Sequence, residues 1–154
     1  MIIRRANPKD LIEIQKLFVE TISIVCKADY NDDQIRAWVS SIENNKRWRD
    51  ILIHQFVLVS LAEEKITGFC TLANGNYIDL LYIHKDYQRQ GIARKLYTVI
   101  EKEAKQRGQT ELTADVSKTA RLFFEKAGFN VLKEQSVYLK GVELINYKMM
   151  KKIV

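Results

Sequence analysis

The chain has 154 residues, 47% of them hydrophobic, which suits one domain of ordinary size and gives no reason to expect a second. Its net charge of +6 and pI near 9.3 are compatible with nucleic acid, an anionic surface or an anionic small molecule as a partner. One proline, six glycines and no internal repeat argue against linker-rich, disordered and solenoid classes.

No segment of the sequence resembles a targeting or membrane-spanning element. The N-terminal segment is charged at Arg4 and Arg5 and contains no apolar core of the kind found in signal peptides. The apolar run of residues 51 to 62 is interrupted by polar residues and is therefore a poor membrane span. We therefore expect a soluble cytoplasmic protein with no membrane partner.

The cysteines and histidines are too few and too scattered for a metal centre. Cys26 and Cys70 lie far apart without Cys-x-x-Cys spacing, and His54 and His84 are the only histidines. We expect two buried thiols in a reducing compartment and no bound metal. A cysteine that carries an acyl group during catalysis is the alternative, but no neighbouring residue marks either thiol as activated.

In chain order the sequence predicts a mixed α/β fold. A strand over residues 1 to 6 is followed by helices over about 8 to 25 and 31 to 48, and by strands over 56 to 61, 65 to 73 and 77 to 84. A helix over 91 to 108, a strand over 111 to 116, a helix over 118 to 127 and strands over 129 to 138 and 142 to 151 complete the order. Asn7 and Pro8 suit a helix start, and Glu63 with Glu64 suits a hairpin turn.

Residues 77 to 108 are the most informative segment, because an apolar strand, a glycine turn and an amphipathic helix follow one another there. Gly91 can adopt backbone angles that other residues avoid and has no Cβ to keep a ligand away. A helix that begins at Ile92 directs free N–H groups and the positive end of its dipole at whatever lies before it. Arg89 and Arg94 add formal charge, so the segment predicts an anionic ligand.

The same order of elements also describes an ordinary connection in an α/β protein. The two common phosphate fingerprints, Gly-x-Gly-x-x-Gly and Gly-x-x-x-x-Gly-Lys-Ser/Thr, do not occur in the sequence. A different kind of phosphate-binding loop is therefore required if the ligand is a phosphate.

Two motifs resemble those of one family, the GNAT superfamily of acetyl-CoA-dependent N-acetyltransferases. The first, similar to the signature Gln/Arg-x-x-Gly-x-Gly/Ala, is Gln88, Arg89, Gln90, Gly91, Ile92 and Ala93. The second, similar to Asn-x-x-Ala-x-x-Phe-Tyr-Glu-Lys-x-Gly-Phe, is Ser117, Ala120, Phe123, Phe124, Glu125, Lys126, Ala127, Gly128 and Phe129. The resemblance spans nearly the whole chain and is weakest over residues 27 to 55.

The resemblance implies one GNAT-like domain over residues 1 to 154, with a mostly antiparallel sheet that splays between its fourth and fifth strands and is flanked by helices. It implies acetyl-CoA as the acyl donor, with its pantetheine arm in the splay. The cofactor-binding residues implied are Leu81, Tyr82, Ile83, Gln88, Arg89, Gln90, Gly91, Ile92, Ala93, Arg94, Ser117, Ala120, Phe123, Phe124 and Lys126.

The chemistry implied is attack of a neutral amine on a thioester, which requires proton removal, oxyanion stabilisation and reprotonation of the thiolate. Strand alternation predicts that Tyr77, Asp79 and Leu81 share the face toward the acceptor. Tyr77 stands where some relatives carry a catalytic Glu, so we expect Asp79 to act as base or amine anchor. The alternative for Asp79 is a solvated or capped strand carboxylate.

The general acid that the resemblance implies is missing, because Phe124 stands where many relatives carry a proton-donating Tyr. Either Tyr82, Tyr138 or Tyr147 substitutes from another element, or the thiolate leaves unassisted.

The acceptor pocket is expected to include aromatic residues of the first two helices, namely Tyr30, Trp38 and Trp48, although such residues more often belong to a core. We expect acetyl-CoA and an amine as partners and no nucleic acid, and a homodimer is left open. Three alternatives remain at this point: a different acyl-CoA, a non-catalytic CoA-binding sensor or interaction module, and a nucleic-acid-binding role suggested only by the pI.

Overall fold

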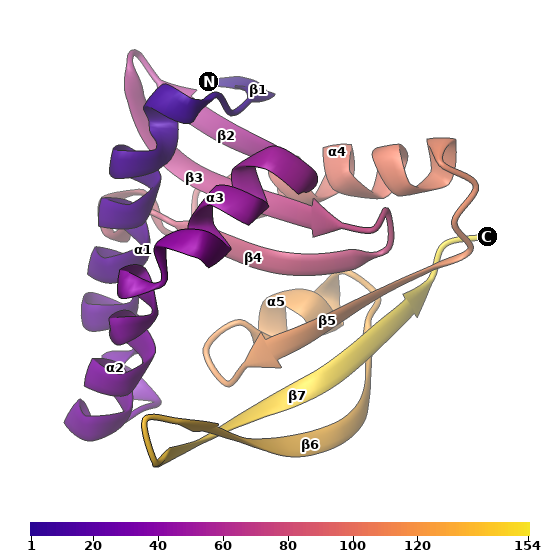
Figure 1. The fold of residues 1–154 in the computed structure, drawn as a ribbon. Coiled ribbons are helices and arrows are strands. Elements are labelled where there is room, and N and C mark those ends of the chain that lie inside the picture. The colour runs from indigo at the N-terminus through magenta and orange to yellow at the C-terminus, as the bar shows by residue number, and fades with distance from the viewer.

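The computed structural model describes residues 1–154, and its strands form one seven-stranded sheet in the order β1-β2-β3-β4-β5-β7-β6 (Figure 1). Neighbouring strands are antiparallel except β4 and β5, which are parallel. The strands are β1 (Ile2–Arg5), β2 (Phe56–Ala62), β3 (Lys65–Ala73), β4 (Tyr77–Ile83), β5 (Glu111–Ser117), β6 (Asn130–Leu139) and β7 (Val142–Lys152). The expected mixed α/β class is confirmed.

Helices cover both faces of this sheet. The bounds of the helices are α1 (Leu11–Ile24), α2 (Asp32–Val39), α3 (Asn45–His54), α4 (Ile92–Gln106) and α5 (Arg121–Lys126). Figure 1 shows α1 and α3 in front of β2 to β4, α2 at the lower left beside α1, and α4 and α5 behind the sheet. Short 3-10 turns link several elements, at Pro8–Asp10, Cys26–Ala28, Ser40–Glu43 and Lys85–Tyr87.

Each face of the sheet has its own apolar core. Leu58 of β2 packs with the α4 residues Leu96 and Ile100, whereas Val57 and Val59 on either side of it pack with α1 and α3. The alternation follows from the two-residue period of a strand, which sends successive side chains to opposite faces. Each fully buried Leu or Ile contributes about 1.5–3 kcal/mol, so the two cores hold the helices to the sheet.

The sheet opens between β4 and β5. These two strands pair only at Tyr77 with Thr113 and at Ile78 with Ala114. Beyond Ile78 the strands diverge, and Figure 1 shows the space between the β1–β4 and β5–β7 halves of the sheet widening toward the end of β4. The splay expected between the fourth and fifth strands is confirmed.

The helix predicted over residues 31 to 48 is wrong as a single element. It is divided into α2, a 3-10 turn at Ser40–Glu43, and α3. The hydroxyls of Ser40 and Ser41 donate to carbonyls of the preceding turn, at 2.6 and 2.8 Å, and Asn44 then caps α3 by accepting from the Arg47 N–H at 3.1 Å. Short polar side chains that compete for backbone hydrogen bonds favour helix ends over helix interiors.

A β-bulge at Asp79 corrects the predicted alternation in β4. The register with β3 pairs Thr71 with Leu80 and Leu72 with Ile78, which leaves Asp79 as the extra residue. Such an insertion shifts the side chains beyond it by one face. Leu81 therefore packs into the α4 core, and Leu80 lies in the core of the opposite face. The expectation that Asp79 and Leu81 share a face is wrong.

The predicted local signals at the chain's turns are confirmed. Asn7 caps the first 3-10 turn with Pro8 at its first position, and Glu63 takes a left-handed φ of 57° between β2 and β3. None of the helices combines the length and the apolar character that a membrane crossing requires.

Candidate active site

The loop before α4 is shaped to receive an anion. Arg89 and Gly91 both have left-handed backbone conformations, with φ of 59° and 78°, and none of the N–H groups from Gln88 to Arg94 donates to a backbone carbonyl. The first bond across the start of α4 runs from the Lys95 N–H to the Gly91 carbonyl, at 3.1 Å. The unbonded N–H groups of this loop lie at the start of α4, where the helix dipole adds positive potential.

A groove of about 470 Å³ runs from this loop to the splay of the sheet. It brings together most of the residues that the sequence motifs singled out: Leu81, Tyr82, Ile83, Gln88, Arg89, Gly91, Ile92, Ala93, Arg94, Ser117, Ala120, Phe123 and Lys126. Two of the predicted set are absent from its walls, since Gln90 is exposed beside it and Phe124 lies in a neighbouring cavity.

Sequence reasoning missed the side of this groove that α1 and the α5 region supply. The additional lining residues are Thr21, Val25, Cys26, Tyr87, Thr119 and Leu122. No local motif marks the α1 residues, because they approach the groove only through the packing of α1 against β4.

Three arginine and lysine side chains give the groove its charge. Arg89, Arg94 and Lys126 all line it, and no acidic residue does. The groove is therefore electrostatically suited to a ligand that carries several negative charges.

The backbone of β4 is free where the sheet splays. The His84 N–H donates to the Thr67 carbonyl of β3 at 2.8 Å, so the Ile83 N–H, one residue earlier, points away from β3 and into the gap. By the same alternation, the N–H and carbonyl of Leu81 also face the gap. The structure thus gives Leu81 and Ile83 unpaired backbone groups along the groove.

Gln88 has a defined role within the protein. Its side-chain amide donates to the Ile83 carbonyl at 2.7 Å, and the Thr21 hydroxyl donates to the same oxygen at 2.9 Å. The Ile83 carbonyl is therefore already satisfied, and Gln88 holds the end of β4 against the start of the anion-binding loop.

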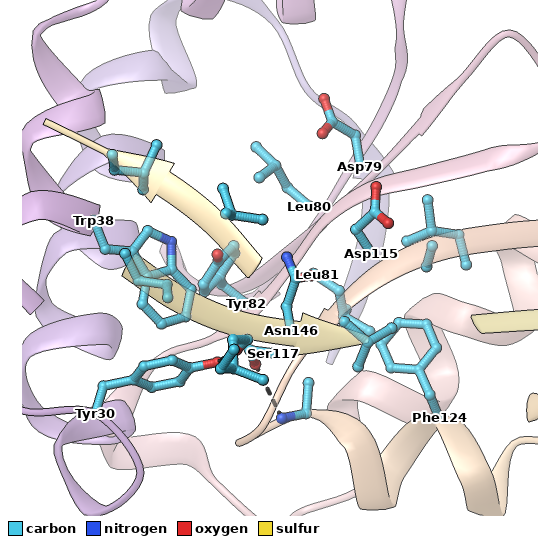
Figure 2. A pocket seen from close by; sticks show the side chains of 18 residues that line it. Tyr30, Trp38, Asp79, Leu80, Leu81, Tyr82, Asp115, Ser117, Phe124 and Asn146 are labelled. Carbon is cyan, nitrogen blue, oxygen red and sulfur yellow. Dashed lines mark hydrogen bonds between the residues drawn. The ribbon is translucent and has the colours of Figure 1, made fainter. Parts of the chain in front are cut away.

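A second, smaller cavity of about 200 Å³ lies in the splay and is lined by residues of β4, β5 and β7 together with Tyr30 and Trp38 (Figure 2). It shares Leu81, Tyr82, Ser117 and Ala120 with the groove, so the two spaces meet at these four residues. Figure 2 shows the rings of Tyr30 and Trp38 at one end of this cavity and the carboxylates of Asp79 and Asp115 at the other. Of the aromatic residues expected here, Trp48 is absent, because it is buried against Phe18.

Asp79 lines this cavity with its carboxylate already hydrogen-bonded. Arg47 of α3 donates to both carboxylate oxygens, at 3.0 and 3.1 Å, and the Gln55 side chain donates to one of them at 2.8 Å. Burial lowers the pKa of the Arg47 guanidinium, but the bonds to Asp79 outweigh this effect and leave the pKa raised. A carboxylate has about four lone-pair sites, so one remains for a further donor.

Asp115 is the other carboxylate of the cavity, and the sequence analysis did not identify it. The Tyr77 hydroxyl donates to one of its oxygens at 2.7 Å and the Gln135 amide to the other at 2.7 Å. Tyr77 itself lines neither space. Burial, together with this bond, raises the pKa of the Tyr77 phenol, so its proton stays on the oxygen that donates to Asp115.

The three tyrosines considered as proton donors lie in different places. Tyr82 lines both the groove and the cavity, and burial raises the pKa of its phenol well above the usual value. Tyr138 is 66% exposed and bonds Glu143 at 3.2 Å, whereas Tyr147 packs under Arg121 at 4.4 Å. The structure brings only Tyr82 to the junction of the two spaces.

Tyr30 contributes to the shape of the cavity. Its hydroxyl donates to the Ile145 carbonyl at 2.7 Å and accepts from the Lys118 N–H at 3.0 Å. Burial raises the pKa of this phenol to about 12. The phenolic proton therefore stays in the hydrogen bond to Ile145, which joins the residue just before α2 to strand β7.

Neither cysteine is activated. Burial raises the pKa of the Cys26 thiol to about 11, and burial likewise raises the pKa of Cys70. A thiol with a raised pKa is a poor nucleophile near neutral pH, which argues against an acyl-cysteine intermediate at Cys26 even though it lines the groove. His, Cys, Asp and Glu side chains do not gather in a group of three or more that could hold a metal ion.

Comparison with known proteins agrees with this geometry. The acetyltransferase (GNAT) domain family model matches residues 26–151. The N-acetyltransferase YafP of Escherichia coli K12, itself uncharacterized, is 31% identical over 147 residues, which are 96% of this chain and 93% of that protein.

Solved structures share the fold. A GCN5-related N-acetyltransferase from Rhodopseudomonas palustris superposes with a TM-score of 0.94 at 30% identity, covering 98% of this chain and 94% of that one. The PaiA N-acetyltransferase from Thermoplasma acidophilum, in complex with coenzyme A, gives a TM-score of 0.77 at 21% identity over 98% of both chains. The chain belongs to the GNAT family and is an acyl-CoA-dependent N-acetyltransferase.

Proposed function

We propose that the protein transfers an acetyl group from acetyl-CoA to a primary amine directly, with both substrates bound at once. The observation that carries this proposal is the junction at Leu81, Tyr82, Ser117 and Ala120, where the basic groove opens into the second cavity. A cofactor that lies in the groove and an amine that enters the cavity would meet there, so no covalent enzyme intermediate is required.

The groove fits coenzyme A in both its chemistry and its extent. The free N–H groups from Gln88 to Arg94 would bind the pyrophosphate, and Arg89, Arg94 and Lys126 would balance the remaining charge. The unpaired backbone groups of Leu81 and Ile83 would bond the pantetheine amides. The complex of the Thermoplasma PaiA protein with coenzyme A supports this assignment, because the two chains share their fold. When bound, acetyl-CoA supplies the acetyl group as a thioester.

On the acceptor side we propose that Asp79 orients the amine. Its remaining lone-pair site would accept an N–H from the bound acceptor molecule, while Arg47 and Gln55 fix the orientation of the carboxylate. The tight ion pair with Arg47 favours this role over that of a strong base. The Leu81 N–H, which faces the gap, is the candidate donor to the oxyanion that develops during attack.

We further propose that Tyr82 protonates the departing thiolate. It is the candidate tyrosine that lines both spaces, and its raised pKa keeps the phenol protonated near neutral pH. The proton lost by the attacking amine then replaces the one that the phenol gives up. Thiolate is a good leaving group, so we expect this assistance to be modest.

The charge distribution supports a small anionic cofactor rather than nucleic acid as the principal anionic ligand. Arg89, Arg94 and Lys126 lie in one groove of defined volume and not along an extended face. We propose that residues 1–154 act as a single domain, since one sheet carries both cores and both substrate spaces.

The test is thiol release from acetyl-CoA in the presence of a panel of primary amines. Release that depends on the amine, with the acetylated amine identified by mass spectrometry, is the expected result. Tight CoA binding without turnover of any amine would instead indicate a binding module. Faster release from a longer acyl-CoA than from acetyl-CoA would change the assigned donor but not the reaction.

A further inference from the structure

The second cavity, where we propose that the amine binds, is called the acceptor cavity below. Its charged lining residues are acidic, although the protein has a net charge of +6. Its lining includes no Lys, Arg or His, and the only ionisable carboxylates on its walls belong to Asp79 and Asp115. Most of the remaining wall is apolar or aromatic, with Tyr30 and Trp38 at the end opposite the two acids and Tyr82 at the junction with the groove (Figure 2).

The two carboxylates differ in how their charge is balanced. Asp79 forms an ion pair with Arg47 through two hydrogen bonds, so together they contribute no net charge. Asp115 accepts only from neutral groups, the Tyr77 hydroxyl and the Gln135 amide, and makes no ion pair. Asp115 is therefore an exposed carboxylate whose orientation two neutral donors fix and which no protein cation contacts as an ion pair, while Lys148 of β7 stands opposite it in the register.

Asp115 lies on strand β5 at some distance from the place where the acetyl group would be transferred. Asp115 and Ser117 lie two residues apart on the same face of the strand, which separates them by roughly 7 Å. Ser117 lies where the cofactor groove and the cavity meet. A nitrogen bound by Asp115 is thus too far along the strand to be the nitrogen that reacts.

We propose that the acceptor is a diamine: its neutral nitrogen reacts at the junction while a second, cationic nitrogen binds Asp115 through a short apolar spacer. This inference rests on the proposed acetyl transfer and narrows its acceptor class. The lining of the cavity is mostly apolar, with Asn146 as a polar side chain opposite Ser117, which suits an apolar spacer, and the Arg47–Asp79 ion pair leaves the second charge to Asp115.

The experiment compares three amines of equal chain length that differ only in the far group: diaminobutane (cationic), n-butylamine (neutral) and aminobutyrate (anionic). We expect kcat/KM to fall in that order, with diaminobutane favoured over butylamine by about three- to tenfold, as for a partly exposed ion pair. Equal values for the first two amines would overturn the inference and leave the proposed acetyl transfer intact. If none of the three reacts, while another amine does, the inference is likewise overturned.

Substitutions of Asp115 test whether this residue causes the preference for diaminobutane over butylamine. Asp115→Asn should remove most of the diaminobutane preference through a higher KM for that amine, with kcat for butylamine and the Kd for CoA little changed. Asp115→Glu should restore part of the preference. Asp50→Asn removes an exposed carboxylate of α3 that makes no ion pair and is the matched control. A preference that survives in Asp115→Asn would contradict the assignment.

Discussion

Arg47 and Asp79 join helix α3 to the bulge of strand β4 through two hydrogen bonds of 3.0 and 3.1 Å. The side chain of Asp79 is 11% exposed, against 43% for Arg47, so the carboxylate is the more enclosed partner. The pair fixes the one carboxylate that lies beside the splay on β4. Because Asp79 also lines the acceptor cavity, the same contact that anchors α3 shapes the place where the amine enters.

Replacement of Asp79 tests its role toward the amine. Asp79→Asn keeps the shape of the side chain but removes the charge and one acceptor oxygen, so we expect kcat to fall by about tenfold. The Kd for CoA, measured by calorimetry, should stay within about twofold, because Asp79 does not line the cofactor groove. Wild-type transfer rates in this variant would remove Asp79 from the mechanism.

A second substitution tests the proton donor. Tyr82→Phe removes the phenolic proton while it keeps the ring packed against Phe18 and Phe69. We expect kcat to fall by about tenfold with the Kd for CoA unchanged, which is modest for a general acid because thiolate leaves readily. The parallel variants Tyr138→Phe and Tyr147→Phe allow comparison, and a larger loss in either of them would transfer the role to that residue.

The Tyr77 hydroxyl provides a test of how Asp115 is positioned. Tyr77→Phe leaves the Asp115 carboxylate with only its bond from Gln135. If the diamine proposal is correct, this variant should raise the KM for diaminobutane by about twofold to fivefold and leave the KM for butylamine unchanged. An equal rise for both amines would indicate a general structural effect instead.

Stability is predicted to depend on an ion pair behind the active site. Glu101 of α4 accepts from Lys151 of β7 at 2.6 Å and from the Tyr97 hydroxyl at 2.5 Å. Although burial opposes it, hydrogen bonding by Lys151 and Tyr97 lowers the pKa of Glu101 to about 2. After allowance for solvent screening we expect Glu101→Gln to lower the free energy of unfolding at pH 7 by about 1–2 kcal/mol.

The same pair predicts a pH dependence with a definite sign. The pKa of Glu101 is lower in the folded state than in the unfolded state, so its stabilisation is complete above about pH 5 and is lost as the pH falls toward 2. Urea unfolding between pH 7 and pH 3 should therefore show the wild type and Glu101→Gln converging at low pH. A constant difference across that range would contradict the linkage.

The elements that carry strong local signals were predictable from the sequence. Gly91 and Gly108 mark the turns that bound α4, and both adopt a left-handed φ of 78° as their residue type favours. The alternating strands and the two motifs predicted the cofactor groove, because those residues are neighbours along the chain or follow from a known fold.

The remaining features depend on contacts between distant segments. No pattern in residues 77 to 84 reveals the bulge at Asp79, which arises from the register of β4 against β3. Asp115 was missed because its importance comes from Tyr77 and Gln135, which reach it from two other strands. The break at Asn44 was missed because the apolar spacing of the flanking helices continues across it.

The central claim is that the loop before α4 binds the pyrophosphate of coenzyme A, and a matched pair of glycine substitutions tests it. Gly91 and Gly108 both have φ of 78° and open space where a Cβ would stand, but only Gly91 lies in the groove. Alanine at either position should destabilise the fold by about 1–2 kcal/mol through the same left-handed strain.

Titration calorimetry of coenzyme A with the two variants is the decisive measurement. We predict that Gly91→Ala raises the Kd for CoA by about tenfold or more, because its Cβ obstructs the approach of the phosphate to the N–H groups, while Gly108→Ala binds as the wild type does. Equal affinity in the two variants would contradict the account.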